Sequence, residues 1–223
     1  MTVPPLVECR GAGRSYPGPV VALHPTSCAV PASARIAMVG PSGSGKSTLL
    51  YLLAGLEGPS SGEVRWPAIG DRRALRPGPV AMVFQGPSLL APLTVRENVA
   101  LPLQLGGTSR HEVETRTVDA LAAVGVEALA DALPEELSGG QAQRVAVARA
   151  IAGSPRLILA DEPTGQLDHA AAANVMDALI AAADVTGAAL VVATHDPAVA
   201  DRLGACWRLH DGRILETQEL TPA

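Results

Sequence analysis

The chain of 223 residues is long enough to bury a sizeable core, as one large domain or as a core with a smaller lobe. Hydrophobic residues make up 48% of it and charged residues only 17%, a balance that excludes an intrinsically disordered protein. The formal net charge of −5 argues against a general polyanion-binding protein, so we expect no nucleic-acid partner.

Strand-like segments occur early in the chain and return in its second half. The residues before 35 resemble strand material, and short aliphatic runs without alternation follow at 35–39, 156–160 and 189–194. Such runs are typical of strands covered on both faces, as in a parallel sheet. Each run is followed by a polar or glycine-rich turn and then a helical pattern, and the segment WRLHDGRILE near the end predicts a hairpin. The pattern therefore predicts an α/β fold.

The strand signal disappears between about residues 86 and 140. Residues 93–103 and 109–126 follow helical patterns, with Ser109 as the expected N-cap and Gly125 as the expected stop. We predict one domain over 1–223, with a core over about 1–85 and 141–223 and a helical subdomain inserted over about 86–140.

No segment of the sequence predicts a targeting signal or a membrane span. The start of the chain lacks a charged stretch followed by an apolar run, so we expect no signal peptide. The most apolar long window, 178–194, is interrupted by Asp184, Thr186 and Gly187, and predicts a helix end, a turn and a buried strand. The cysteines Cys9, Cys28 and Cys206 show no metal-ligand spacing and fit a reducing compartment.

The stretch GPSGSGKST matches the phosphate-loop pattern G-x-x-x-x-G-K-[ST] between a predicted strand and a predicted helix. Its glycines let backbone N–H groups face a phosphate, and the helix N-terminus adds partial positive charge. Lys46, the only lysine in the chain, supplies a compact ammonium group to the β- and γ-phosphates, and Ser47 offers a hydroxyl to Mg²⁺. The alternative is a glycine- and serine-rich turn that caps an ordinary helix. The strand before the loop and the lone lysine both argue against this alternative. The predicted nucleotide-binding residues here are Gly40, Pro41, Ser42, Gly43, Ser44, Gly45, Lys46, Ser47 and Thr48.

A phosphate loop alone leaves GTPases, small-molecule kinases, recombinase-like motors and transporter ATPases open. A typical GTPase is disfavoured, because its guanine-reading N-K-x-D motif needs a second lysine. Asp161 and Glu162 follow a buried strand, at the edge where an open α/β sheet binds its ligand. We expect Asp161 to be the acid associated with Mg²⁺ and Glu162 to polarise an attacking water, although adjacent acids also occur as simple helix caps.

The stretch LSGGQAQRVAVARA, which begins at Leu137, is the most specific part of the sequence. Taken alone, it predicts a helix capped by Ser138 whose N-terminus can bind an anion. Together with the phosphate loop, Gln85 after PVAMVF, LILADE at 157–162, Gln166-Leu167-Asp168 and His195 after ALVVAT, it resembles the motif set of ABC-type ATPases. The resemblance covers residues 6–217.

The resemblance implies a P-loop NTPase (RecA-like) core with a small antiparallel β-lobe and an inserted α-helical subdomain. It also implies an ATP-bound homodimer in which two chains, arranged head to tail, sandwich two ATP molecules. The signature residues Ser138, Gly139, Gly140 and Gln141 would then meet the γ-phosphate held by the other chain.

Several further roles follow from the resemblance alone. Gln85 is expected to touch Mg²⁺ and the water, and His195 to meet the γ-phosphate. Asp168 is expected to communicate across the dimer. Tyr16, in RSYPGPVVAL, resembles the aromatic residue that stacks on adenine, with simple packing as its alternative.

The closer resemblance is to the branch of lipoprotein-releasing, macrolide-export and cell-division ATP-binding subunits. Members of that branch use ATP to drive a separate transmembrane permease, which implies a peripheral protein at the cytoplasmic face of the membrane. Two departures are a short Pro-, Gly- and Arg-rich stretch after SGEVRW, which predicts a trimmed β-lobe, and Gln166 in place of the more usual asparagine. The alternative function is a soluble ABC-type ATPase in DNA repair, chromosome maintenance or translation. Its usual second cassette, coiled coil or zinc cysteines do not appear in this sequence.

Overall fold

The computed structural model describes residues 3–18 and 20–219. Its strands are β1 (Val7–Ser15), β2 (Val21–Val30), β3 (Arg35–Val39), β4 (Ser61–Arg65), β5 (Val80–Val83), β6 (Leu157–Asp161), β7 (Ala189–Thr194), β8 (Ala205–His210) and β9 (Arg213–Glu219). Its α-helices are α1 (Lys46–Leu53), α2 (Val95–Leu105), α3 (Arg110–Ala123), α4 (Gly139–Ile151), α5 (His169–Thr186) and α6 (Pro197–Ala200). Short 3₁₀ helices are η1 (Arg72–Ala74), η2 (Glu127–Leu129) and η3 (Pro134–Glu136).

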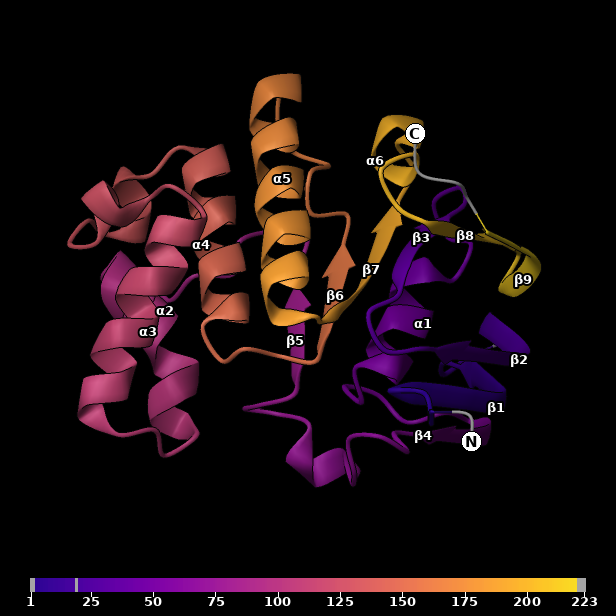
Figure 1. The fold of residues 1–223 in the computed structure, drawn as a ribbon. Helices are drawn as coiled ribbons and strands as arrows, with labels where there is room; N and C mark the ends of the chain where they lie inside the picture. Colours follow the sequence, from indigo (N-terminus) through magenta and orange to yellow (C-terminus); the bar gives the residue numbers. More distant parts are fainter. Residues whose placement is uncertain (1–2, 19, 220–223) are drawn as a thin grey trace.

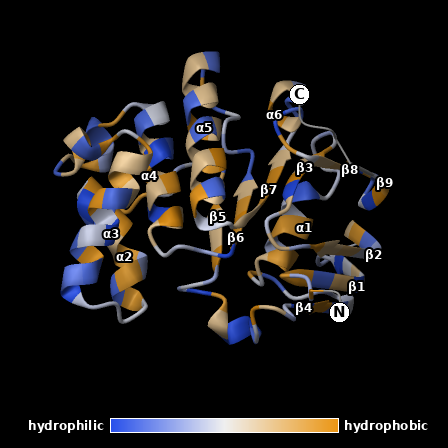
Figure 2. Cartoon of the chain, in the orientation of Figure 1, coloured by the Kyte–Doolittle hydropathy of each residue, from blue (hydrophilic) through white to orange (hydrophobic). Residues whose placement is uncertain are grey.

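A six-stranded sheet in the order β5-β6-β7-β3-β8-β9 forms the centre of the molecule (Figure 1). The strands from β5 to β8 are parallel, and β9 pairs antiparallel with β8. Along β6, Leu157 and Leu159 pack into one hydrophobic cluster, while Ile158 and Ala160 pack into the other. The structure thus confirms that the aliphatic runs are strands buried on both faces, and Figure 2 shows β6 and β7 mainly in the tan and orange of apolar residues.

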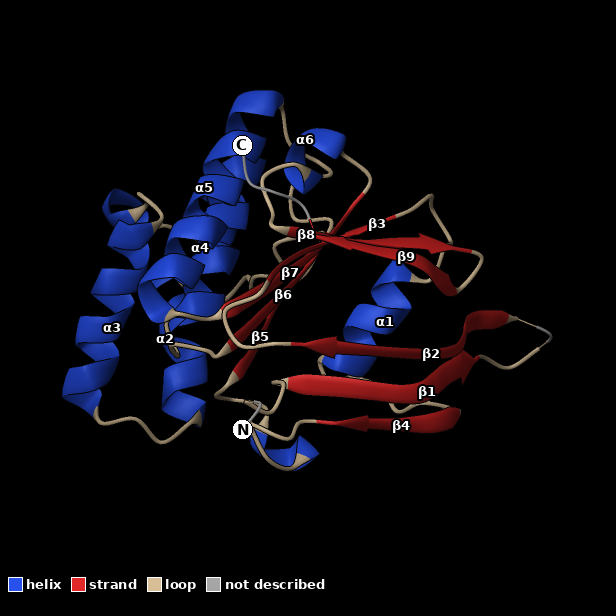
Figure 3. Ribbon diagram, turned by 45° about the vertical axis from the view of Figure 1, so that its right-hand side comes forward, coloured by secondary structure: helices blue, strands red, loops and turns tan. Residues whose placement is uncertain are grey.

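Helices and a second sheet cover the two faces of the central sheet. The helix α1 lies between the central sheet and a three-stranded antiparallel sheet in the order β2-β1-β4 (Figure 3). Residues of α4, α5 and α6 pack on the other face. This arrangement confirms the predicted α/β core with a small antiparallel β-lobe. Between β4 and β5 the chain forms turns and η1 rather than further strand.

The helical subdomain follows β5, and in the described residues no strand lies between β5 and β6. Ser109 caps α3 by accepting a hydrogen bond from the N–H of Glu112, as predicted. Gly125 follows the end of α3 with a positive φ of 63°, which glycine adopts without strain. The helix α4 begins just before the boundary that we predicted at 140, and it contacts α2 and α3 as well as α5 and β5. It is therefore shared between the helical subdomain and the core.

The later predictions also agree with the structure. Residues 178–194 form the end of α5, a turn at Gly187 and the buried strand β7. The segment WRLHDGRILE forms most of the β8–β9 hairpin. Among the described residues, no helix combines the length and the apolar character needed to cross a membrane.

Candidate functional site

The phosphate loop connects β3 to α1 at the edge where β3, β6 and β7 end (Figure 1). Gly43 and Gly45 have φ values of 79° and 96°, which a residue with a side chain adopts only with strain. A Cβ on Gly40 would lie 2.3 Å from the carbonyl oxygen of Leu209, and one on Gly45 would lie 2.6 Å from that of Ala22. The glycines therefore let the loop pack directly against β2 and β8.

The side chain of Lys46 is buried beneath this loop, with an exposed fraction of 7%. Its Nζ donates hydrogen bonds to the carbonyl oxygens of Gly40, at 2.8 Å, and Pro41, at 3.2 Å. The same ammonium group lies 3.6 Å from Oε1 of Glu162. The only lysine of the chain is thus held at the loop by backbone oxygens and by one carboxylate.

Asp161 ends β6 beside the start of α1. Its Oδ1 accepts a hydrogen bond from the Ser47 hydroxyl at 3.0 Å, and its side chain is buried. Burial raises the pKa of the Asp161 carboxyl, whereas hydrogen bonds from Ser47 and Tyr51 act in the opposite direction. A hydroxyl and a carboxylate are the hard oxygen donors that Mg²⁺ prefers, so these residues fit that ion.

Glu162 adopts a positive φ of 46°, which is uncommon for a residue with a side chain. Its N–H donates to the carbonyl oxygen of Ala193, and its carboxylate lies between Lys46 and His195, with Oε2 2.8 Å from Nδ1 of His195. The His195 side chain is 67% exposed, compared with 15% for Glu162. The backbone turn thus directs a carboxylate over the phosphate loop.

Gln85 lies in the loop after β5 and is exposed. Its amide nitrogen is 3.5 Å from the position that a Cβ on Gly165 would take, so it reaches the segment that follows Glu162. The preceding residue, Phe84, accepts a hydrogen bond through its carbonyl oxygen from the buried Gln143 of α4, at 3.0 Å. Gln85 is therefore connected both to the core site and to the signature helix.

The signature residues gather at a different place, where α4 and α5 begin. Ser138 and Gln141 form a capping box, in which the Ser138 hydroxyl accepts from the Gln141 N–H and the Gln141 side chain accepts from the Ser138 N–H. Asp168 caps α5 by accepting from the N–H of Ala171 at 2.8 Å. A depression of about 260 Å³ lies here and is lined by Ser138, Gly139, Gly140, Gln141, Arg144, Gln166, Leu167, Asp168, Ala171 and Asn174.

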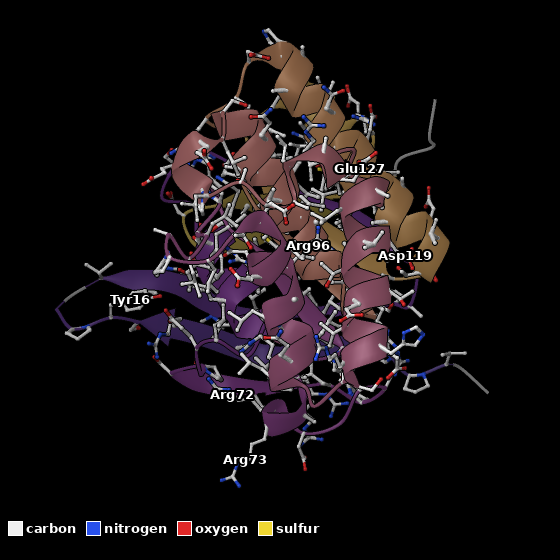
Figure 4. The ribbon with its side chains drawn as sticks, turned by 90° about the vertical axis from the view of Figure 1, so that its left-hand side faces the viewer. Tyr16, Arg72, Arg73, Arg96, Asp119 and Glu127 are labelled. Atoms are coloured by element: carbon white, nitrogen blue, oxygen red, sulfur yellow. The ribbon has the colours of Figure 1, made fainter. Side chains whose placement is uncertain are left out.

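Tyr16 lies in the β1–β2 connection, in a third location. Figure 4 shows it away from Arg96, Asp119 and Glu127, which lie on the helical side of the molecule. Its hydroxyl donates to Oε2 of Glu57 at 2.8 Å, and the guanidinium of Arg14 lies 4.9 Å from the centre of its ring.

Sequence reasoning missed three side chains that contact the predicted residues. Tyr51 interacts with Asp161, and burial together with that carboxyl raises the pKa of the Tyr51 phenol. Its position one helical turn after Ser47 was a signal that could have identified it, because such residues share a face. Glu57 carries no comparable signal, since it lies 41 positions from Tyr16. Arg14 lies two positions before Tyr16 at the end of β1, and this spacing was a signal, because residues two apart on a strand share a face.

A larger apolar groove of about 690 Å³ separates the core from the helical subdomain. It is lined by residues around β5, including Met82 and Phe84, and by Leu90, Leu101 and Leu105 of the helical side. Leu90 and Leu105 are exposed by 46% and 70%, so large apolar side chains face solvent here.

The chain matches the model of the ABC transporter family over residues 23–165. It is 41% identical over 221 residues to the lipoprotein-releasing system ATP-binding protein LolD of Chromohalobacter salexigens, an alignment covering 95% of this chain and 93% of that relative. It is 42% identical over 187 residues to the LolD protein of Legionella pneumophila strain Lens, covering 81% and 82%.

Solved structures of similar proteins agree with the fold. The dimeric structure of MJ0796, a bacterial ABC transporter cassette, has a TM-score of 0.87 at 34% identity, over 96% of this chain and 99% of that one. A dimeric post-hydrolysis state of MJ0796 bound to ADP and Pi has a TM-score of 0.86 at the same identity and coverage. The structure of cbiO1 from Clostridium perfringens, part of the ABC transporter complex cbiONQ, has a TM-score of 0.85 at 26% identity, covering 96% and 88%.

Proposed function

Because this chain belongs to the ABC transporter family and is an ATP-binding, ATP-hydrolysing subunit of such a transporter, we propose that it drives a separate permease from the cytoplasmic face of the membrane. The observation that carries this proposal is the pair of separated sites. One gathers Lys46, Ser47 and Glu162 around the phosphate loop, and the other places the signature residues beside Asp168.

The phosphate-loop side would bind ATP together with Mg²⁺. Backbone N–H groups of the loop and the Lys46 ammonium are suited to phosphate oxygens. Ser47 and Asp161, and Gln85 from its loop, would hold Mg²⁺, which when bound neutralises charge that develops on the phosphates. The buried position of Asp161 supports this role, since a buried carboxylate is stabilised by a nearby cation.

Glu162 would act as the general base for hydrolysis. Its carboxylate contacts Lys46 at 3.6 Å, and phosphate binding to Lys46 would exchange that contact for phosphate oxygens. Glu162 would then accept a proton from the attacking water, while His195 orients the carboxylate and meets the γ-phosphate. The exposed side chain of His195 leaves it able to reach a phosphate.

The signature side would complete the site of a second copy of the chain. Gly139 and Gly140 begin α4 without side chains, so a phosphate of the other chain can approach the helix N-terminus closely. The dimeric structures of MJ0796 support a dimer of this chain, and the head-to-tail arrangement with ATP bound is part of the proposal. A single chain would therefore hydrolyse ATP only very slowly.

The apolar groove between the core and the helical subdomain would receive the permease. Its exposed leucines and the arginines Arg76, Arg116 and Arg149 among its lining residues suit an amphipathic segment with an apolar face and acidic flanks. The loop of Gln85 starts at this groove, so movement of the permease segment can reach the nucleotide.

The variant Glu162→Gln tests both parts of the proposal. We expect its ATP turnover to fall by about 100-fold or more, because the general base is lost, while ATP binding persists and the dimer is trapped. A tagged form incubated with ATP and detergent-solubilised membranes of the host should retain a permease, identified by mass spectrometry.

A matched pair of surface changes locates the contact. Leu105→Asp, in the groove, should abolish permease retention, whereas Val118→Asp, at an exposed position of α3 outside the lining of the groove, should preserve it. Recovery of soluble or nucleic-acid partners alone would contradict the transporter proposal and favour a soluble ABC-type ATPase. Wild-type turnover by Glu162→Gln would contradict the assignment of the base.

A further inference from the structure

The ring of Tyr16 is held from two directions by side chains that no motif identified. Its hydroxyl donates to Oε2 of Glu57 at 2.8 Å, and the guanidinium of Arg14 covers one ring face at 4.9 Å from the centroid. Nε of Arg14 lies 2.9 Å from the same Glu57 oxygen. The contacts thus form a closed set in which each of the three side chains touches the other two.

The Arg14–Glu57 pair is more buried than an ordinary surface ion pair. Both side chains are about three-quarters buried, with exposed fractions of 27% and 26%. Arg14 also donates through Nη1 to the carbonyl oxygen of Gly58 at 3.0 Å. Partly buried ion pairs are less screened by solvent than exposed ones, so this pair can fix the orientation of the ring.

Glu57 belongs to the turn that ends the helix of the phosphate loop. The N–H groups of Leu56 and Glu57 both donate to the carbonyl oxygen of Tyr51, at 2.9 Å and 3.2 Å. The next residues bind β1 directly, since the N–H of Ser60 donates to the carbonyl oxygen of Gly13 at 2.7 Å. Glu57 therefore connects the Tyr16 ring to the helix that begins at Lys46.

We infer that Arg14 and Glu57 are positioning residues that hold the Tyr16 ring, at a set distance from the phosphate loop, for stacking on the base of an adenine nucleotide. This inference rests on the proposed role of Tyr16. Because Arg14 covers one face of the ring, the base stacks on the other face. The pair thus acts on recognition of the base and leaves recognition of the phosphates unchanged.

The test compares a nucleotide with a ligand that lacks the base. Binding of ATP and of inorganic tripolyphosphate is measured by calorimetry, and stacking is followed by the quenching of 1,N6-etheno-ATP fluorescence. Arg14→Gln and Glu57→Ala should weaken ATP binding by about fivefold and reduce the quenching, with tripolyphosphate binding unchanged. Glu57→Gln, which keeps an acceptor for the Tyr16 hydroxyl, should recover part of the loss.

Two controls separate this inference from the proposed function. Tyr16→Ala should lose the quenching altogether, and if it does not, the stacking role of Tyr16 fails. Glu63→Gln breaks the 2.7 Å ion pair with Arg65 on β4 of the same sheet. It should change the binding of neither ATP nor tripolyphosphate. If Tyr16→Ala loses the quenching while Arg14→Gln and Glu57→Ala retain it, the positioning role is overturned. Equal weakening of ATP and tripolyphosphate would also overturn it, because that result indicates general damage to the fold.

Discussion

The phosphate-loop side and the signature side of the candidate site are built in opposite ways. Lys46 and Asp161 are buried and held by contacts from several elements, whereas Ser138 and Gly139 are exposed and rely on a cap made within their own helix. A group that holds charged phosphates by itself benefits from being fixed in advance by the core. A group that completes the site of another chain has to face outward.

The largest expected effect comes from disabling each side separately. Lys46→Ala and Ser138→Arg should each lower ATP turnover by about 100-fold or more, because each removes contacts to the phosphates. They should differ in binding, since only Lys46→Ala weakens ATP binding to the isolated chain. Calorimetry on dilute protein and a phosphate-release assay measure the two properties.

Mixing the two variants sharpens the comparison. A mixed dimer contains one site with an intact phosphate loop and an intact signature, so an equal mixture should recover up to about a quarter of wild-type turnover. Wild-type turnover by Ser138→Arg alone would show that the signature side takes no part in hydrolysis.

An intermediate effect is expected from adding one methyl group to a glycine on each side. A Cβ on Gly40 would lie 2.3 Å from a backbone oxygen, so Gly40→Ala should destabilise the fold by about 1–3 kcal/mol. A Cβ on Gly139 would meet only Leu167, at 3.8 Å, so Gly139→Ala should leave stability unchanged or raise it slightly. Urea unfolding of both variants measures the difference, and equal destabilisation would contradict the contrast in packing.

The smallest effect concerns the exposed start of the helical subdomain. Hydrogen bonds from Thr94 lower the pKa of Glu97, which closes the capping box of α2. A lowered pKa in the folded state means that the stabilisation is present at neutral pH and is lost as the pH falls below the ordinary glutamate value of 4.5 and then through the folded pKa. The protection of the amides at the start of α2, which is their exchange rate relative to that of an unstructured chain at the same pH, should therefore decrease in acid, and Glu97→Gln should make that protection less dependent on pH.

Much of the fold could be predicted because its elements carry local signals. The aliphatic runs, the glycine-rich loop and the Ser109 cap are all readable within a few residues. The ATPase function followed from the ordered motifs and agrees with the family and with the similar structures. The roles of the individual site residues stay predictions until the variants are measured.

Other features could not be read from the sequence because they depend on contacts between distant residues. The contact of Tyr16 with Glu57 spans 41 positions, and that of Phe84 with Gln143 spans 59. The positive φ of Glu162 is equally hidden, because the sequence shows an ordinary glutamate and only the strand pairing around it imposes the turn. The position of α4 is a further example, because this helix contacts both the helical subdomain and the core, whereas the loss of the strand signal predicted a boundary near residue 140.

The burial of the only lysine has a practical consequence for chemical labelling. An acylating reagent directed at side-chain amines has a single target in this sequence, and that target lies under the phosphate loop with 7% of its surface exposed. Its acylation rate would report on the occupancy of the nucleotide site without any engineered probe. Because every other residue among the 17 Lys and Arg is arginine, the modification of the one side-chain amine can be followed in the single peptide that contains Lys46.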